Sequence, residues 1–194
     1  MVSVAIVVEG GGRGELHAAA FKRGWGAFFR RAGVSSISVV RGGARERAFD
    51  LFKRLVATRD GLVVLLVDSE SAVEPGQTPW GHLKARDGWD RPAAADQDSA
   101  YLMVQTTETW LIADREALAR HFGRGFRDSA LPTRANLEDV PKAEAEAKLK
   151  AATRDCPAPF EKRHAWEILA MLDASRVEAA CPHAKHLLER LRTG

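Results

Sequence analysis

The chain has few of the features that mark secreted, membrane or zinc-binding proteins. Its 194 residues include two cysteines, Cys156 and Cys181, and no Cys-x-x-Cys pair or His/Cys cluster, so no zinc site is expected. A disulfide between the two cysteines is possible, but free thiols in a reducing cytoplasm are the favoured expectation. No apolar run approaches the roughly 20 residues that span a bilayer. The N-terminal strand also lacks the flanking segments of a signal peptide. We therefore expect a cytoplasmic protein with no membrane association.

Two phosphate-binding motifs are missing from the glycine-rich turn at residues 10–14. A Walker loop requires Gly-Lys-Ser/Thr, which does not follow here. The dinucleotide fingerprint requires a third glycine where Glu15 stands, and Glu9 would repel a pyrophosphate. The glycines instead predict a flexible turn that lets a phosphodiester approach the backbone.

Short apolar runs alternate with amphipathic segments over the first 112 residues. The predicted strands are residues 2–8, 36–40, 62–67 and 101–105, and the predicted helices are residues 15–32, 44–58 and a segment that begins at Glu108. Such alternation implies parallel strands joined by right-handed crossovers. A 2-1-3 strand order would make the first and third strands neighbours. The predicted fold class is α/β, with a parallel sheet flanked by helices.

The rest of the chain differs from this alternating part. Proline, glycine and tryptophan interrupt residues 71–98, which predicts a long functional or mobile loop. Helical segments are predicted at residues 137–153, 163–172 and 182–191. We therefore divide the chain into an α/β core, residues 1–114, that includes the 71–98 loop, and a helical C-terminal subdomain, residues 115–194.

Carboxylates follow the first and third predicted strands directly. Glu9 follows the first strand, and Asp68 and Glu70 follow the third. Because the carboxyl ends of parallel strands form the ligand crevice, these acids should meet there. Hard oxygen ligands in such a group suit Mg²⁺ or Mn²⁺. The alternative is a helix cap together with solvated acids.

Charge is segregated along the sequence. Residues 13–59 carry eleven Lys or Arg against three Asp or Glu, a local net charge of +8, whereas residues 60–116 have a local net charge of −7. A basic block beside an acidic edge suits a protein that holds a polyanion near a metal. Solvated helix faces explain the same pattern equally well. The candidate contacts to a nucleic-acid backbone in this block are Arg13, Lys22, Arg23, Arg41 and Arg45.

Further candidates lie outside these strand ends. Glu108 begins a helix after the fourth strand and is either a further ligand, a base that orients water, or a charge at a helix N-terminus. Lys142, Lys162 and His164 would contact the scissile phosphate if the helical part folds over the sheet edge, and are otherwise exposed helix charges. In the 71–98 loop, Trp80, Arg86 and neighbouring side chains would clasp nucleic acid, unless the tryptophans anchor the loop to the core.

The acids also resemble a known signature. Val8-Glu9-Gly10 and Asp68-Ser69-Glu70 are similar to the Toprim motif of topoisomerases, primases and overcoming-lysogenization-type nucleases, which has an Asp-x-Asp pair after its third strand. Here glutamate replaces the second aspartate, which keeps the charge and lengthens the arm. This resemblance implies a Toprim-like Rossmannoid fold and a Mg²⁺ site at Glu9, Asp68 and Glu70.

A second resemblance covers nearly the whole chain. It is to DUF4276, a bacterial family of Toprim-like proteins often encoded beside an ATPase in anti-phage defence loci. The matching stretches are Val8-Glu9-Gly10-Gly11, Leu65-Leu66-Val67-Asp68-Ser69-Glu70, Pro79-Trp80-x-His82-Leu83, Arg86-Asp87-Gly88-Trp89, Met103-Val104-Gln105, Glu108-Thr109-Trp110-Leu111-x-Ala113-Asp114, Leu131-Pro132, Pro141-Lys142 and Lys162-Arg163-His164.

Two functions follow from these expectations. The preferred one is a Mg²⁺- or Mn²⁺-dependent endonuclease that cleaves DNA, with RNA as an alternative, and that works in defence with an ATPase partner. The alternative is a non-catalytic sensor or interaction subunit of an ATPase complex, docking through Leu187, Leu188 and Leu191, which are also simple core candidates. Homo-oligomerisation stays open.

Overall fold

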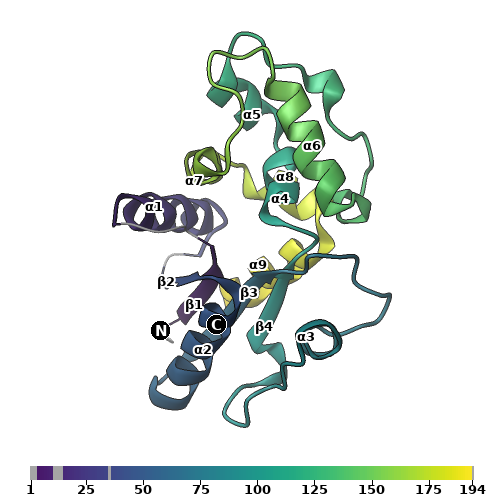
Figure 1. The fold of residues 1–194 in the computed structure, drawn as a ribbon. Coiled ribbons are helices and arrows are strands. Elements are labelled where there is room, and N and C mark those ends of the chain that lie inside the picture. Colours follow the sequence, from purple (N-terminus) through teal and green to yellow (C-terminus); the bar gives the residue numbers. More distant parts are fainter. Residues whose placement is uncertain (1–3, 11–14, 35, 194) are drawn as a thin grey trace.

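Four parallel strands form the centre of the molecule. The computed structural model describes residues 4–10, 15–34 and 36–193. Within them β1 (Val4–Glu9), β2 (Ile37–Gly43), β3 (Leu62–Asp68) and β4 (Ala100–Met103) lie in the order β2-β1-β3-β4 (Figure 1). The α/β fold class and the adjacency of the first and third strands are therefore confirmed.

The two faces of the sheet are covered by different helices. Alternate side chains of a strand point to opposite faces. Val4, Ile6 and Val8 accordingly pack in the core on the side of α1 (Glu15–Arg31). Val7 packs in the other core, with α2 (Arg45–Thr58) and α3 (Pro79–Asp87). This two-sided burial explains why the strands read as continuous apolar runs.

The C-terminal half is helical and shares the first of these cores. Its helices are α4 (Thr107–Ala113), α5 (Arg115–Phe122), α6 (Lys142–Thr153), α7 (Ala165–Leu169), α8 (Ala174–Ala180) and α9 (Pro182–Thr193), with 3-10 turns at Leu137–Asp139 and Lys162–His164. One apolar cluster runs from α1 through α4 to α9. Trp25 of α1 and Trp110 of α4 meet edge to face in it, with ring centroids 5.7 Å apart. The division into residues 1–114 and 115–194 stays a prediction.

The prediction of a long loop at residues 71–98 is partly wrong, because α3 lies within it. Thr78 caps the helix by accepting a hydrogen bond from the Gly81 N–H, Pro79 begins it, and Gly88 ends it in the left-handed region. Trp80 and Trp89 are both 5% exposed, and Trp89 stacks on Phe49 at 4.2 Å. The tryptophans anchor this segment, so the predicted contact of Trp80 with nucleic acid is wrong.

Other expectations for the helical half also change. The predicted helix at 137–153 is a 3-10 turn followed by α6, and α5 and α8 were not predicted. Leu187, Leu188 and Leu191 are at most 3% exposed, so they belong to the core and form no docking surface. Cys156 and Cys181 are buried free thiols. Among the described helices, none has the length and apolar character needed to cross a membrane.

Candidate functional site

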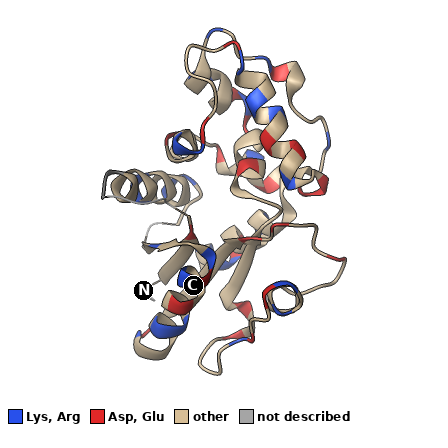
Figure 2. Cartoon of the chain, in the orientation of Figure 1, with Lys and Arg blue, Asp and Glu red and all other residues tan. Residues whose placement is uncertain are grey.

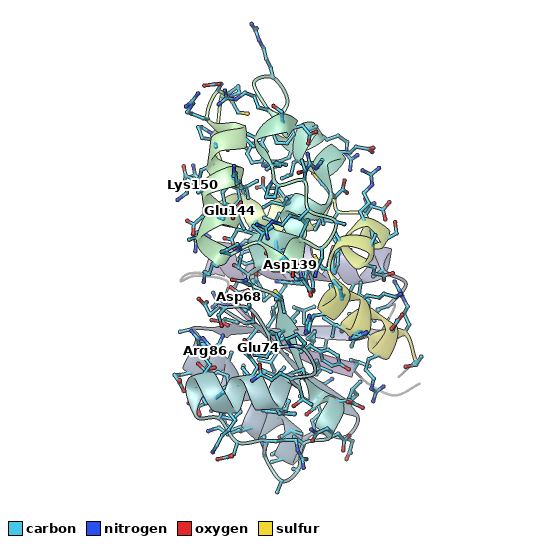
Figure 3. The ribbon with its side chains drawn as sticks, turned by 90° about the vertical axis from the view of Figure 1, so that its right-hand side faces the viewer. Asp68, Glu74, Arg86, Asp139, Glu144 and Lys150 are labelled. Carbon is cyan, nitrogen blue, oxygen red and sulfur yellow. The ribbon has the colours of Figure 1, made fainter. Side chains whose placement is uncertain are left out.

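An open cavity of about 590 Å³ lies at the carboxyl ends of the strands. Glu9, Asp68, Glu70 and Glu108 line one side of it, and we call these four residues the acidic wall. Lys162, Arg163 and Trp166 line the side formed by the 3-10 turn and α7, and we call these three the helical wall. Figure 3 shows Asp68 at the level where the sheet meets the C-terminal helices.

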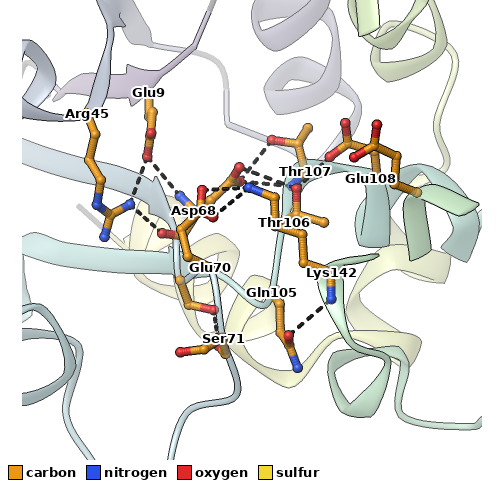
Figure 4. Close-up of polar contacts among 12 residues, drawn as sticks. Glu9, Arg45, Asp68, Glu70, Ser71, Gln105, Thr106, Thr107, Glu108 and Lys142 are labelled. Atoms are coloured by element: carbon orange, nitrogen blue, oxygen red, sulfur yellow. Dashed lines mark hydrogen bonds and ion pairs between the residues drawn. The ribbon is translucent and has the colours of Figure 1, made fainter. Parts of the chain in front are cut away.

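Glu9 and Asp68 end neighbouring strands and are in direct contact. The backbone N–H of Asp68 donates to Oε2 of Glu9 at 3.2 Å (Figure 4). Burial raises the pKa of Glu9 above its ordinary value, although the Arg45 charge and this hydrogen bond act in the opposite direction. The structure thus brings together two of the predicted site residues, as the strand order implies.

Arg45, the first residue of α2, ties the acidic wall to α3. Its Nη1 donates to Glu9 Oε2 at 3.0 Å and to the Asp68 carbonyl at 2.6 Å. Its Nε and Nη2 donate to the two carboxylate oxygens of Asp87 at 3.0 and 2.7 Å, and its guanidinium lies 5.2 Å from the Trp89 ring centroid. Burial would raise the pKa of Asp87, but Arg45 holds it below its ordinary value. Arg45 is therefore a structural clamp rather than the exposed backbone contact that was predicted.

The Asp68 carboxylate is hydrogen-bonded at the start of α4. The N–H and hydroxyl of Thr107 donate to Oδ1 at 2.9 and 3.2 Å. Burial, followed by the charges of Glu9 and Glu108, raises the pKa of Asp68 to about 7. The Thr106 hydroxyl has one proton, which it donates to Glu108, while it lies 3.3 Å from Asp68 Oδ2. The positive charge of Lys142 acts in the opposite direction but does not cancel this rise in the pKa of Asp68.

Glu70 is paired with Lys142, the first residue of α6. Lys142 Nζ donates to both carboxylate oxygens of Glu70 at 2.6 Å, with the two side chains 28% and 26% exposed. The Gln105 side chain accepts from the Lys142 N–H at 3.1 Å, and the Gln105 carbonyl accepts from the Glu70 N–H at 2.9 Å. Burial opposes the Lys142 charge, but the hydrogen bond to Glu70 and the charge of Asp68 raise its pKa.

The donor chemistry of the acidic wall fits a divalent cation. Its groups are hard carboxylate oxygens, and the pKa of Asp68 is raised first by burial and then by the charges of Glu9 and Glu108, an imbalance that a bound cation would relieve. In the described residues, however, no three His, Cys, Asp or Glu side chains are arranged closely enough to ligate one ion. Glu9 and Glu70 each face a protein cation instead. The residue types therefore suit Mg²⁺ or Mn²⁺, and the side chains are compensated by Arg45 and Lys142.

The predicted basic residues are dispersed. Lys22 and Arg23 are exposed on α1, Arg41 lies in β2, and Arg86 pairs with Asp87 on α3. None of these four lines the cavity. Arg13 lies outside the described residues. Figure 2 colours both charge signs on α2 and α6, which is the pattern of solvated helix faces that we had kept as the alternative.

Lys162 and His164 are two residues apart but have different surroundings. Lys162 is 66% exposed and lines the cavity, 4.0 Å from Glu146. His164 accepts from the Glu161 N–H through Nδ1 at 3.1 Å and packs near Phe122 and Phe160. His164 does not line the cavity and forms part of a capping box, so the expectation that it reaches a scissile phosphate is not met.

Several residues at the site were not predicted. Asp87 belongs to one of the stretches that match DUF4276, but nothing in the sequence indicates that it pairs with Arg45, 42 positions away. Thr106 is the N-cap of α4 and Thr107 is its first residue, so the Thr-Thr-Glu run is a recognisable helix start at the same sheet edge as the acids. His17 and Trp166 also line the cavity, and no local pattern marks either one.

The fold and site define an α/β protein with a carboxylate-lined cavity at the carboxyl edge of a parallel sheet. The chain belongs to the family described as a domain of unknown function (DUF4276), whose model matches residues 8–192. No curated protein and no solved structure gives a significant match to the chain.

Proposed function

We propose that this protein is a Toprim-like, divalent-metal-dependent nuclease that hydrolyses phosphodiesters of nucleic acid. The observation that carries the proposal is the convergence of four carboxylates, from three separate chain segments, on a cavity that Lys142, Lys162 and Arg163 also line. A protein rarely gathers partly buried acids without a cation or a proton to compensate them. The basic residues opposite would attract a phosphate group to the same place.

Asp68, Glu9 and Glu70 are the residues proposed to hold Mg²⁺ or Mn²⁺. A divalent cation supplies, when bound, a water of lowered pKa and positive charge against the transferring phosphoryl group. Glu70, which is paired with Lys142 in the structure, would hold the ion together with Glu9 and Asp68. Lys142, whose amine lies next to the acidic wall, would donate to a phosphate oxygen.

Glu108, the fourth residue of the acidic wall, and Lys142 transfer the protons. Glu108, whose carboxylate is fixed by Thr106, accepts the proton of the attacking water. The water oxygen bonds to phosphorus, the phosphorus–oxygen bond to the departing sugar breaks, and the departing oxygen takes a proton from Lys142. A departing alkoxide is a stronger base than the amine of Lys142, so this proton transfer is downhill. Arg45 holds the Glu9 carboxylate by an ion pair and opposes the rise in its pKa that burial causes.

The test is a cleavage assay with the purified chain and with Asp68→Ala. Plasmid DNA, single-stranded DNA and RNA are incubated in Mg²⁺ or Mn²⁺, alone and with the ATPase that the family resemblance leads us to propose as a partner in anti-phage defence. Cleavage that requires metal and disappears with Asp68→Ala supports the proposal. Equal cleavage by the variant, or none under any condition, rejects it.

A further inference from the structure

One aromatic side chain borders the candidate site, and its surroundings differ from those of every other tryptophan. The chain has five tryptophans, all among the described residues. Trp25, Trp80, Trp89 and Trp110 are at most 5% exposed and lie in the cores. Trp166 is partly exposed and lines the cavity. A large apolar ring at the wall of a charged cavity is a candidate contact for a ligand with a flat ring.

Trp166 is fixed close to the acidic wall. A methyl group in place of the Gly10 hydrogen would stand 3.5 Å from Cη2 of Trp166, and Gly10 directly follows Glu9. Phe21 meets the Trp166 ring edge to face, with centroids 4.9 Å apart. The backbone of Trp166 packs so closely on α1 that a side chain at Gly24 would collide with its carbonyl. The ring is therefore preorganised, and little entropy would be lost when a ligand stacks on it.

Two cations line the same cavity as this ring. Lys162 and Arg163 belong to the 3-10 turn that precedes α7 and are 66% and 62% exposed. Their partners are acids of the helical half, Glu146 and Glu161, in solvent-exposed pairs that contribute little to stability. An aromatic ring with adjacent cations, facing carboxylates suited to a metal, matches the parts of a nucleotide: a flat base, and a phosphate that both walls contact.

The size of the cavity favours single-stranded over double-stranded nucleic acid as the ligand. Its volume of about 590 Å³ is that of a small-molecule pocket, typically roughly 300–1,000 Å³. A double helix is too wide to enter such a space as a whole, and its bases stay paired and stacked inside it. A base can also present its face to an aromatic side chain only when it is unstacked from its neighbours, as in single strands.

We propose that the substrate is an unpaired strand, with one base stacked on Trp166 while its phosphate lies between the acidic wall and Lys162 and Arg163. This inference rests on the proposed nuclease function and adds the substrate class. DNA and RNA single strands share the recognised chemistry, so both are included in the test. Duplex is the form that the site should reject.

The experiment measures binding without metal, so that it does not depend on cleavage. Fluorescein-labelled oligothymidylate and oligouridylate, and each strand annealed to its complement, are titrated with protein in EDTA, and anisotropy is recorded. Intrinsic fluorescence of the protein is followed with unlabelled strands. Single strands should quench the tryptophan emission and bind about tenfold more tightly than duplex. Trp166→Leu should weaken single-strand binding about tenfold, and Trp166→Phe less than threefold.

Two variants test the stacking and the phosphate contact separately. Trp166→Phe retains an aromatic ring but removes the emitting indole, so it should bind well with no quenching. Lys162→Ala tests the phosphate contact and leaves the packing of α7 on α1 intact, so it should weaken single-strand binding without a change in fold. Thermal unfolding of each variant identifies any loss of fold.

The possible results distinguish the two proposals. Equal affinity for single strand and duplex, or unchanged single-strand binding by a folded Trp166→Leu, overturns the substrate assignment. If metal-dependent cleavage persists in that case, the nuclease proposal stands without it. Absence of any binding by the wild-type chain overturns the assignment as well, and absence of any cleavage removes the function on which it rests.

Discussion

The two walls of the cavity are built in opposite ways. Each carboxylate of the acidic wall is engaged by a partner: Arg45 for Glu9, Thr107 for Asp68, Lys142 for Glu70 and Thr106 for Glu108. The cations of the helical wall are exposed and have distant or solvated partners. The acidic wall thus concentrates like charge at a cost to stability, whereas the helical wall is nearly free of such cost. This contrast suits the two proposed roles: the acidic wall would bind the metal and carry out the reaction, and the helical wall would attract the ligand.

The largest effect is expected from Asp68→Asn, which should lower the cleavage activity while it raises the stability. Loss of a proposed metal ligand should reduce cleavage on the order of a thousandfold. Because burial raises the pKa of Asp68 from 3.8 to about 7, the folded state binds this proton more tightly than the unfolded state. Stability of the metal-free protein therefore falls as pH rises from about 4 to about 7. Asp68→Asn should raise the free energy of unfolding on the order of 2 kcal/mol at pH 8.

The measurement is thermal unfolding in EDTA at pH 8 and at pH 5, where the gain should shrink. Added Mg²⁺ should stabilise the wild type at pH 8 and leave Asp68→Asn unchanged. Asp50→Asn is the matched control: its pKa is lowered by Lys53, so removing that charge should not stabilise the protein. If Asp68→Asn were less stable than wild type at pH 8, the Asp68 charge would not be destabilising, and the prediction would be wrong.

The second prediction concerns the clamp behind the acidic wall. Arg45→Met removes the cation paired with Glu9 and one of the two paired with Asp87, which keeps Arg86; the Glu9 and Asp87 side chains are 17% and 7% exposed. Breaking a buried ion pair on one side should lower the free energy of unfolding by about 3 kcal/mol, as measured by urea denaturation. Lys53→Met on the same helix removes an exposed pair, 46% and 61% exposed, and should cost less than about 1 kcal/mol. Equal losses for the two variants would show that Arg45 clamps nothing.

The clamp also marks the limit of what the sequence could predict. The continuous apolar runs of β1 and β3 predicted buried parallel strands, and strand order then placed Glu9 beside Asp68, where their contact is now found. Arg45 and Asp87 belong to helices that meet only when α3 folds back over the sheet. Propensity and spacing carry no information on that meeting, since it depends on the packing of Trp89 on Phe49.

The same limit applies to the aromatic residues. Trp80 and Trp166 look alike in the sequence, each near basic residues and histidine. Trp80 is buried in the core with α2, and Trp166 lines the cavity. Their difference arises from which helix covers them, so composition alone could not distinguish the buried tryptophan from the one that lines the cavity. His164 was likewise predicted from its neighbours, although successive residues of a 3-10 turn point in different directions.

A third prediction tests whether Lys142 compensates the acidic wall in place of a metal. Lys142→Met removes the cation paired with Glu70 and should make Mg²⁺ binding about fivefold tighter, because less positive charge opposes the ion. Cleavage should nevertheless fall, since the proposed donor to the phosphate is lost. Isothermal titration with Mg²⁺ gives the affinity, and Lys148→Met, at an exposed position of α6, is the control. Weaker Mg²⁺ binding by Lys142→Met would mean that Lys142 organises the ligands instead of competing with the ion.

The smallest effect on stability is expected at the helical wall. Arg163→Ala removes a cation that is 62% exposed and paired with Glu161, so the free energy of unfolding should change by less than about 0.5 kcal/mol. A phosphate contact is nevertheless visible in salt dependence: the slope of log affinity against log salt for a single strand should fall by about 0.7. Lys185→Ala, which alters an exposed lysine of α9 that does not line the cavity, should leave the slope unchanged. If both variants gave the wild-type slope, the helical wall would differ from the acidic wall in exposure alone, and the phosphate would be held by Lys142 and the acidic side of the cavity.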